Sequence, residues 1–266
     1  MGGRGSKSSI ASGSATGGSL FNAQNQQNSQ QSIANQAPTP ANTPVNPAGV
    51  TALTQMTDDE LAALYQKSKT VDMPNHLSDI DNNTQKFVYT AGLNGKPEVL
   101  DDAAFNQYLK DNNIPRSQIM ARTVGDASYV VNGTNIRLSP DQITMMLKDG
   151  ELNYIGGKAA GKSWYGHGTY FDMNGGTPTG YGYGSRNSAT CIGVLSKNAK
   201  IISDRALASQ ATSFAASHPK FAKAVGKYST NTMSIYALAM GYNVIQSGSY
   251  HNVIDRTALV MRSSNY

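Results

Sequence analysis

The chain has 266 residues, of which 39% are hydrophobic and 15% are charged, which allows one sizeable core but not two. The net charge is +5, but the basic residues are scattered, and a nucleic-acid-binding surface needs them clustered. We therefore disfavour a dedicated DNA- or RNA-binding protein. No window approaches the ~18 apolar residues of a membrane helix, so we expect no membrane association.

Residues 1–56 are rich in Gly, Ser, Asn, Gln, Ala and Pro and carry only two charged side chains, Arg4 and Lys7. Such a segment cannot bury enough apolar surface to offset its chain entropy, so we expect a disordered tail. Four prolines between positions 38 and 47 favour an extended tether. The Gln/Asn-rich part could instead act as a sticky assembly segment, but a plain linker is the preferred interpretation.

Residues 57–117 have the pattern of a helical lead-in. Thr57 and Glu60 have the spacing of a capping box, and an apolar helical stripe follows at Leu61, Leu64 and Tyr65. A short element is expected at residues 85–90, and a second amphipathic helix at residues 101–109.

Residues 118–266 alternate between strand and helix patterns. Helices are expected from Ser139–Pro140 to Gly150, at residues 206–216 and at residues 233–240, the last ending at Gly241. Strands are expected at residues 119–124, 191–195, 199–202, 242–246 and 252–261. The stretch 156–184 contains ten glycines and should be mostly loop. This succession predicts an α+β domain with a largely antiparallel, split sheet.

Two segments of this domain have residues suited to binding a ligand. In residues 164–172, Gly166 and Gly168 let the backbone approach a ligand, and Tyr170 offers a flat ring for stacking. The alternative to ligand binding is a structural one, in which Tyr170 and Phe171 only anchor a strand in the core. Composition alone favours this alternative. Arg122 lies midway along an apolar strand, so it either meets a carboxylate or phosphate or ends the strand in solvent.

A third candidate segment is the late strand. By alternation His251, Val253 and Asp255 share one face, while Asn252, Ile254 and Arg256 share the other. Polar residues on both faces predict a strand that borders a polar site. The alternative is an Asp255–Arg256 pair at a solvent-exposed edge.

The order of these motifs resembles one family. A glycine-rich start and the run at residues 85–90 precede Arg122, and Gly-His-Gly-Thr-Tyr-Phe follows at residues 166–171. Gly-Tyr-Asn-Val-Ile at residues 241–245 and Asp-Arg-Thr-Ala-Leu at residues 255–259 complete the series. Over residues 85–262 this succession resembles the ADP-ribosyltransferase-like domain of phage minor head and other virion structural proteins. The resemblance implies two small antiparallel sheets with a cleft between them.

The resemblance also implies an activity. NAD would be the substrate, and its ADP-ribose would be transferred to a host protein or nucleic acid. Arg122 matches the residue that grips the phosphate or ribose side of NAD. Gly168, Tyr170 and Phe171, with His167 and Thr169 in the same motif, match the segment that stacks on nicotinamide. No metal is implied. The protein would be virion-associated, act in the host cytoplasm, or both, and other virion proteins are possible partners.

The late strand departs from the family pattern. A glutamate normally faces the cationic sugar in the transition state, but the chain has none from Tyr242 to its end. Ser249 and His251 stand where glutamates are expected, and Asp255 is the only acidic candidate. The sequence therefore predicts Asp255 and His251 as the catalytic residues of a weak enzyme. The alternative is a virion structural module that keeps the fold without the chemistry.

Overall fold

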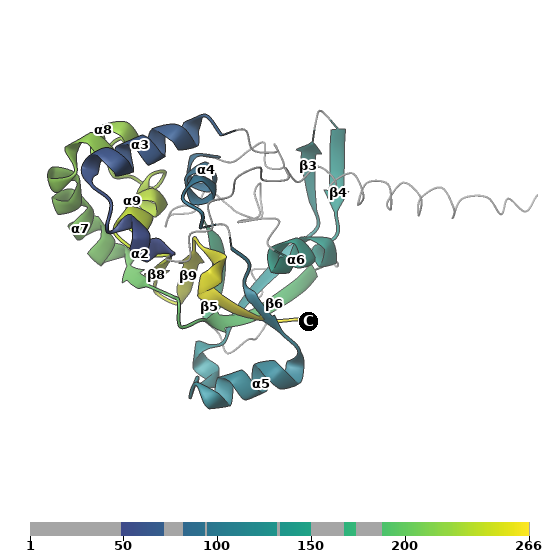
Figure 1. Cartoon of the computed structure of the whole chain (residues 1–266). Coiled ribbons are helices and arrows are strands. Elements are labelled where there is room, and N and C mark those ends of the chain that lie inside the picture. Colours follow the sequence, from purple (N-terminus) through teal and green to yellow (C-terminus); the bar gives the residue numbers. More distant parts are fainter. Residues whose placement is uncertain are drawn as a thin grey trace, which may run out of the picture. The chain divides into compact units, whose positions relative to one another are not determined.

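The computed structural model of the chain is organised around an eight-stranded mixed sheet with the order β1-β10-β6-β2-β5-β9-β8-β7 (Figure 1). It describes residues 49–71, 82–93, 95–131, 134–149, 168–173 and 188–265, all within one unit of the chain, Pro40–Tyr266. The strands of this sheet are β1 (Glu98–Leu100), β2 (Met120–Gly125), β5 (Thr169–Met173), β6 (Ser188–Leu195), β7 (Ile201–Ser203), β8 (Val244–Ser247), β9 (Tyr250–Val253) and β10 (Leu259–Arg262). A separate hairpin pairs β3 (Ala127–Val131) with β4 (Thr134–Leu138). The predicted α+β class is confirmed.

The helices pack against the two halves of this sheet. The larger core joins Ile202 and Ile245 to α2 (Val50–Leu53), α3 (Asp58–Lys69), α4 (Asn82–Thr90), α7 (Asp204–Ser217), α8 (Pro219–Val225) and α9 (Met233–Ala239). A smaller core joins β2, β6 and β10 to α5 (Asp102–Asp111), which lies apart from the other helices in Figure 1. Helix α6 (Pro140–Asp149) packs against β2 and β6, and η1 (Arg116–Gln118) and η3 (Arg256–Ala258) are short 3₁₀ helices.

The sheet is divided between β2 and β5. These two strands share only the pairs Met120↔Met173 and Ala121↔Asp172, whereas β2 pairs with β6 over its whole length. Strand β5 in turn pairs with β9 from Thr169 to Asp172. Beyond Ala121, therefore, β2 belongs to one half-sheet and β5 to the other, and a split opens between them.

The sheet is also strongly curled. Strands β6 and β7 lie five positions apart in the sheet order, which would separate them by about 24 Å in a flat sheet. Residues 196–200 connect them, and six extended Cα–Cα steps reach at most about 22 Å. A turn in which the amide of Ala199 donates to the carbonyl of Ser196 (3.0 Å) shortens that reach further. The sheet must therefore curl until its β7 edge approaches the end of β6.

Several predicted helix ends are confirmed. The hydroxyl of Thr57 accepts from the amide of Glu60, and the Glu60 carboxylate accepts from the amide of Thr57, which completes the capping box. At the end of α9, Gly241 has a φ of 86°, and its amide donates to the carbonyl of Leu238. The amide of Tyr242 donates to the carbonyl of Ala237, so these bonds form a Schellman motif.

One sequence prediction about strands is wrong. The long strand expected at residues 252–261 is broken into β9, η3 and β10, because Asp255 accepts from the amide of Thr257 and caps η3. The glycine-rich stretch contains β5, since its residues 169–173 pair with β9 and β2. Apart from residues 168–173, the stretch 156–184 lies outside the described residues.

The predicted boundary of the tail at residue 56 is too late in the chain. Val50 and Leu53 of α2 are buried in the larger core, although four residues with one turn of helix give little sequence signal. Residues 1–48, the rest of the predicted tail, lie outside the described residues. The lead-in at residues 57–117 does not form a core of its own, because α3 and α4 share the core of α7–α9 and β1 joins the sheet.

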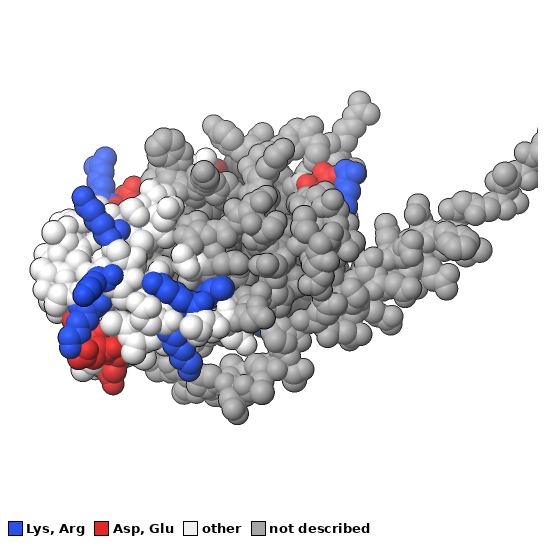
Figure 2. Space-filling view, turned by 90° about the horizontal axis from the view of Figure 1, so that it is seen from above, with Lys and Arg blue, Asp and Glu red and all other residues white. Residues whose placement is uncertain are grey.

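The surface matches the scattered charge of the sequence. On the face in Figure 2, the Lys and Arg side chains of the described residues stand apart from one another, and acidic side chains lie among them. None of the helices that the structure describes is long and apolar enough to span a membrane.

Helix α2 gives a direct test of the corrected boundary. Leu53→Ala should lower the free energy of unfolding by about 2–5 kcal/mol, because it leaves a cavity in the larger core. The exposed neighbour Thr51 provides the matched control, since Thr51→Ala removes a side chain of the same helix that is not in the core. Chemical denaturation measures both. Equal effects of the two substitutions would mean that α2 is not docked.

Candidate functional site

Arg122 and Tyr170 meet across the split. A terminal NH of the Arg122 guanidinium donates a hydrogen bond of 2.9 Å to the backbone carbonyl of Tyr170. Arg122 is only 8% exposed, so this bond lies in a largely dry environment, where a guanidinium needs acceptors. The arginine predicted to face a cleft thus connects the two half-sheets at the point where their strands diverge.

The side chains of Tyr170 and Arg122 point to opposite faces of the sheet. The pairs Met120↔Met173 and Ala121↔Asp172 fix this, because directly paired residues point to the same face and neighbours alternate. Arg122 therefore shares a face with Met120 and Phe171, and Tyr170 shares the other face with Asp172. The two predicted ligand-binding residues are adjacent through the Tyr170 backbone, not through its ring.

The start of β5 approaches β9 closely. A Cβ atom on Gly168 would lie 1.9 Å from Oδ1 of Asn252, so only glycine fits there. Thr169 and Phe171 are buried, and Phe171 pairs with His251 of β9. This is the close backbone approach that the glycine pattern predicted, although the group approached is a side chain of the protein itself. His167 lies outside the described residues.

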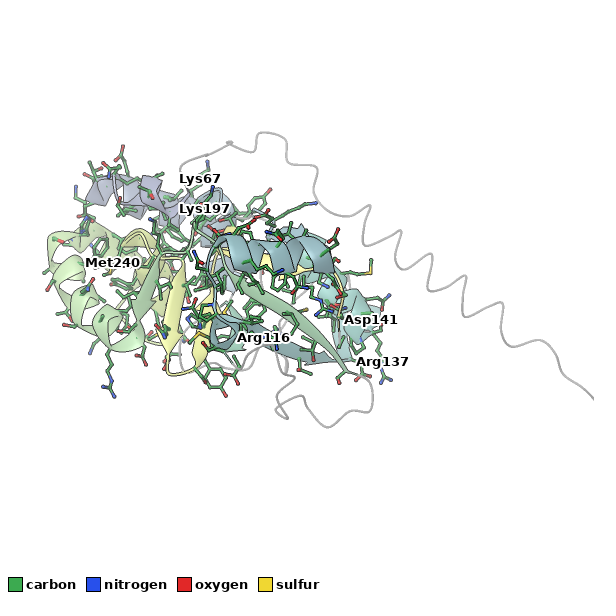
Figure 3. All side chains as sticks on the ribbon, turned by 90° about the horizontal axis from the view of Figure 1, so that it is seen from below. Lys67, Arg116, Arg137, Asp141, Lys197 and Met240 are labelled. Carbon is green, nitrogen blue, oxygen red and sulfur yellow. The ribbon has the colours of Figure 1, made fainter. Side chains whose placement is uncertain are left out.

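Asp255 lines a polar cavity of about 530 Å³. Its carboxylate accepts hydrogen bonds from the amide (3.0 Å) and hydroxyl (2.9 Å) of Thr257, and burial raises its pKa above the ordinary value. The wall of this cavity also includes Asn243, Lys200 and Lys197, which is labelled in Figure 3. Asp255 is therefore a capping residue with its oxygens already engaged.

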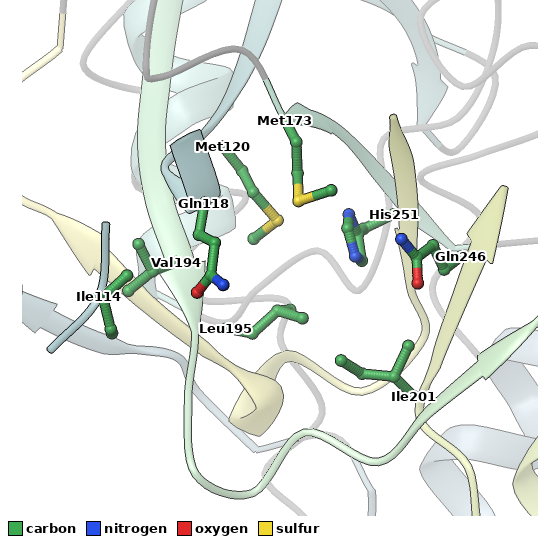
Figure 4. Close-up of a pocket in the computed structure, with 9 residues that line it drawn as sticks. All are labelled: Ile114, Gln118, Met120, Met173, Val194, Leu195, Ile201, Gln246 and His251. Carbon is green, nitrogen blue, oxygen red and sulfur yellow. The ribbon is translucent and has the colours of Figure 1, made fainter. Parts of the chain in front are cut away.

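A second cavity, of about 340 Å³, lies inside the curl of the sheet (Figure 4). Six strands each contribute to its wall a side chain that, by the pairing register, points to the same face. These six are Leu195 (β6), Met120 (β2), Met173 (β5), His251 (β9), Gln246 (β8) and Ile201 (β7). Ile114, Gln118 and Val194 complete the lining. The curl thus brings strands from both half-sheets around one space.

His251 is one of three polar residues that line this cavity, with Gln118 and Gln246. It is 2% exposed, and among the described residues its Nδ1 has no hydrogen-bond partner. Burial lowers the pKa of the imidazole, which favours the neutral ring. Figure 4 shows the ring lying across the cavity from Met120, with Met173 beside it.

The two predicted catalytic residues, His251 and Asp255, are not brought together. They line different cavities, and neither cavity includes Arg122 or Tyr170. The shared face expected from alternation required a strand through residue 255, but β9 ends at Val253. The shared face, from which Asp255 was expected to replace the missing glutamate, is therefore absent.

Sequence reasoning missed Asp172. It lies two residues from Tyr170 on the same face of β5, is partly buried, and pairs with Ala121 at the last point where the half-sheets are joined. The alternation within Tyr170-Phe171-Asp172 could have identified it, because residues two apart in a strand share a face.

Cys191 lies on β6 and is buried. Burial raises the pKa of its thiol to about 11, so the thiol stays protonated at neutral pH. Since the thiolate is the reactive form, Cys191 has the character of an inert core residue.

Comparisons of the chain with protein-family models, with curated proteins and with solved structures found no match.

The burial of His251 predicts a stability effect of acid. Its pKa is lower in the folded state than in the unfolded chain, so lowering the pH below about 6.5 favours unfolding until the folded-state pKa is passed. Between pH 7.5 and 5.5, the free energy of unfolding of the wild type should therefore fall relative to that of His251→Gln. The fall should be at most ~1.4 kcal/mol per pH unit. Urea denaturation across this range measures it. A difference independent of pH would contradict the burial of a neutral ring.

Proposed function

We propose that the chain is an ADP-ribosyltransferase-like protein that binds NAD at the split between β2 and β5 and transfers ADP-ribose to a host macromolecule. The observation that carries the proposal is the Arg122–Tyr170 hydrogen bond, at the place where the two half-sheets separate. A ligand at such a split meets strand ends and backbone groups from both halves. The motif order of the sequence supports the same site.

Arg122 would hold the diphosphate of NAD. A guanidinium carries five N–H donors in a planar fork, so one donor can hold the Tyr170 carbonyl while the fork also faces a phosphate. The low exposure of Arg122 favours an anion at this position, because a cation in a dry environment gains most from a charged partner. A lysine could not reproduce this role, since its ammonium lacks the planar fork.

Tyr170 would stack on the nicotinamide ring. Its side chain is partly exposed, unlike the neighbouring Phe171, which is 1% exposed. The phenylalanine therefore fixes β5 in the core while the tyrosine on the opposite face stays accessible. This division supports a binding role for Tyr170 and an anchoring role for Phe171.

Asp172 would supply the carboxylate that the late strand lacks. NAD provides the ADP-ribosyl group with nicotinamide as the leaving group, and a carboxylate near the sugar favours the positive charge that develops there. Asp172 shares the face of Tyr170, whereas the oxygens of Asp255 are engaged with Thr257. We therefore assign the carboxylate role to Asp172 in place of Asp255 and His251.

The engaged Asp255 also favours a second candidate function. A chain without a positioned glutamate could serve as a non-catalytic module of a phage virion, in contact with other virion proteins. This candidate predicts no NAD turnover, and in its strict form no NAD binding. The enzyme would act in the host cytoplasm, and the module would stay with the virion.

Binding of NAD tests the proposed site. Arg122→Lys and Tyr170→Ala should each weaken binding about tenfold or more, through loss of the fork and of ring stacking worth about 1–3 kcal/mol. Tyr170→Phe keeps the ring and should stay within about threefold of wild type by this stacking argument. Calorimetry measures the affinities, with Arg116→Lys on η1 (Figure 3) as the matched control. Unchanged affinity in both Arg122→Lys and Tyr170→Ala would reject the site.

Turnover separates the two functions. With host lysate and labelled NAD, Asp172→Asn should lower the rate of ADP-ribose transfer about a hundred- to a thousandfold, as for loss of a transition-state electrostatic contact. The matched variant Asp255→Asn should have no comparable effect on the rate per folded molecule. Robust transfer that Asp172→Asn leaves intact would refute the assignment. Absence of transfer and of NAD binding in the wild type would favour the structural module.

A further inference from the structure

The cavity inside the curl of the sheet has a lining that is entirely uncharged. Six of its nine lining residues are apolar, and the polar ones are Gln118, Gln246 and His251. A volume of about 340 Å³ falls in the range of small-molecule sites, which are mostly apolar with a few placed polar groups. Neither an anion nor a cation would find an opposite charge there, so the lining selects an uncharged ligand.

His251 adds a directional requirement. Its Nδ1 is buried and, among the described residues, has no hydrogen-bond partner. A neutral imidazole carries one donor and one acceptor nitrogen, so its full satisfaction requires a polar partner. Buried polar groups are nearly always paired, and the cavity is the space beside the ring in which such a partner fits (Figure 4).

The two methionines add a preference for aromatic rings. Met120 and Met173 are a directly paired couple on β2 and β5, and both line the cavity. Thioether sulfur makes favourable contacts with ring edges, and the flexible methionine side chain adapts to the shape of a ligand. A cavity of roughly 150 Å³ is enough for benzene, so about twice that volume accepts two fused rings.

We propose that this cavity binds an uncharged two-ring heteroaromatic molecule whose ring N–H or ring nitrogen forms one hydrogen bond with Nδ1 of His251. The site is separate from the proposed NAD site, because Arg122, Gly168 and Tyr170 are not among its lining residues. Met120 lies two residues before Arg122 on the same face of β2, so the two sites are neighbours along that strand. The ligand would therefore bind beneath the joined end of the split.

The test compares two probes of equal ring size. Indazole has a ring N–H beside a ring nitrogen and so suits either tautomer of His251, whereas indene has the same fused skeleton without polar atoms. The two differ in their cost of leaving water, but that difference is the same for every variant of the protein. The informative quantity is the ratio of their dissociation constants in wild type and in His251→Phe.

Ligand-detected NMR on the full chain should show both probes binding to the wild type. The preference for indazole over indene should fall about tenfold in His251→Phe, as expected for loss of one buried hydrogen bond. Ile201→Trp should block both probes, because Ile201 lines the cavity and its 45% exposure lets the larger side chain be accommodated. Val99→Trp on the other edge strand, where Val99 is 39% exposed, is the matched control and should leave both affinities unchanged.

Three results would overturn the proposal. The first is that the wild type binds neither probe, and the second is that the indazole preference is equal in wild type and His251→Phe. The third is displacement of indazole by NAD, which would make the cavity part of the NAD site. If His251→Phe does not fold, loss of both probes in Ile201→Trp and retention in Val99→Trp still test the location. A wild type that binds indazole but not NAD would contradict the proposed function and leave this proposal standing.

Discussion

The hydrogen bond from Arg122 to the carbonyl of Tyr170 is the interaction on which the central part of the structure depends. Among the described residues, backbone pairing joins β2 to β5 at Met120↔Met173 and Ala121↔Asp172, and the Arg122 bond continues this connection beyond Ala121. A charged donor to a carbonyl in a largely dry environment is stronger than a neutral pair, worth about 1.5–3 kcal/mol. This bond holds β2 and β5 together at the point where their backbone pairing ends.

The curl of the sheet follows from chain connectivity and in turn creates the inner cavity. The short connection from β6 to β7 forces the edges toward each other, and side chains from six strands then face one space. The helices of the larger core cover the opposite face of β7 and β8 through Ile202 and Ile245. The split and the cavity therefore belong to the same sheet. Strands β2 and β5 border the split and also contribute side chains to the cavity.

Local signals in the sequence predicted much of the fold. The capping box at Thr57, the glycine end at Gly241 and the apolar strand around Arg122 all depend on neighbouring residues, and all were found where expected. Helix α2 was missed, because a four-residue helix is stabilised by distant partners. Composition favoured a strand anchored by Tyr170 and Phe171, but its pairing with β9 joins residues too distant in the sequence to be predicted. The face to which Asp255 points was predicted wrongly for a related reason. Alternation predicts faces only while a strand continues, and the side chain of Asp255 itself ends the extended segment by capping η3.

The central claim is that NAD binds where Arg122 bridges the half-sheets, and side-chain NMR of arginine tests it most directly. The Nε–H signal of Arg122 can be assigned by its loss in Arg122→Lys and then followed during titration with NAD. Our account predicts a saturable shift of this signal together with the amide signals of residues 121–123 and 169–171. Saturating NAD that leaves the Arg122 signal and both amide groups unchanged would contradict it.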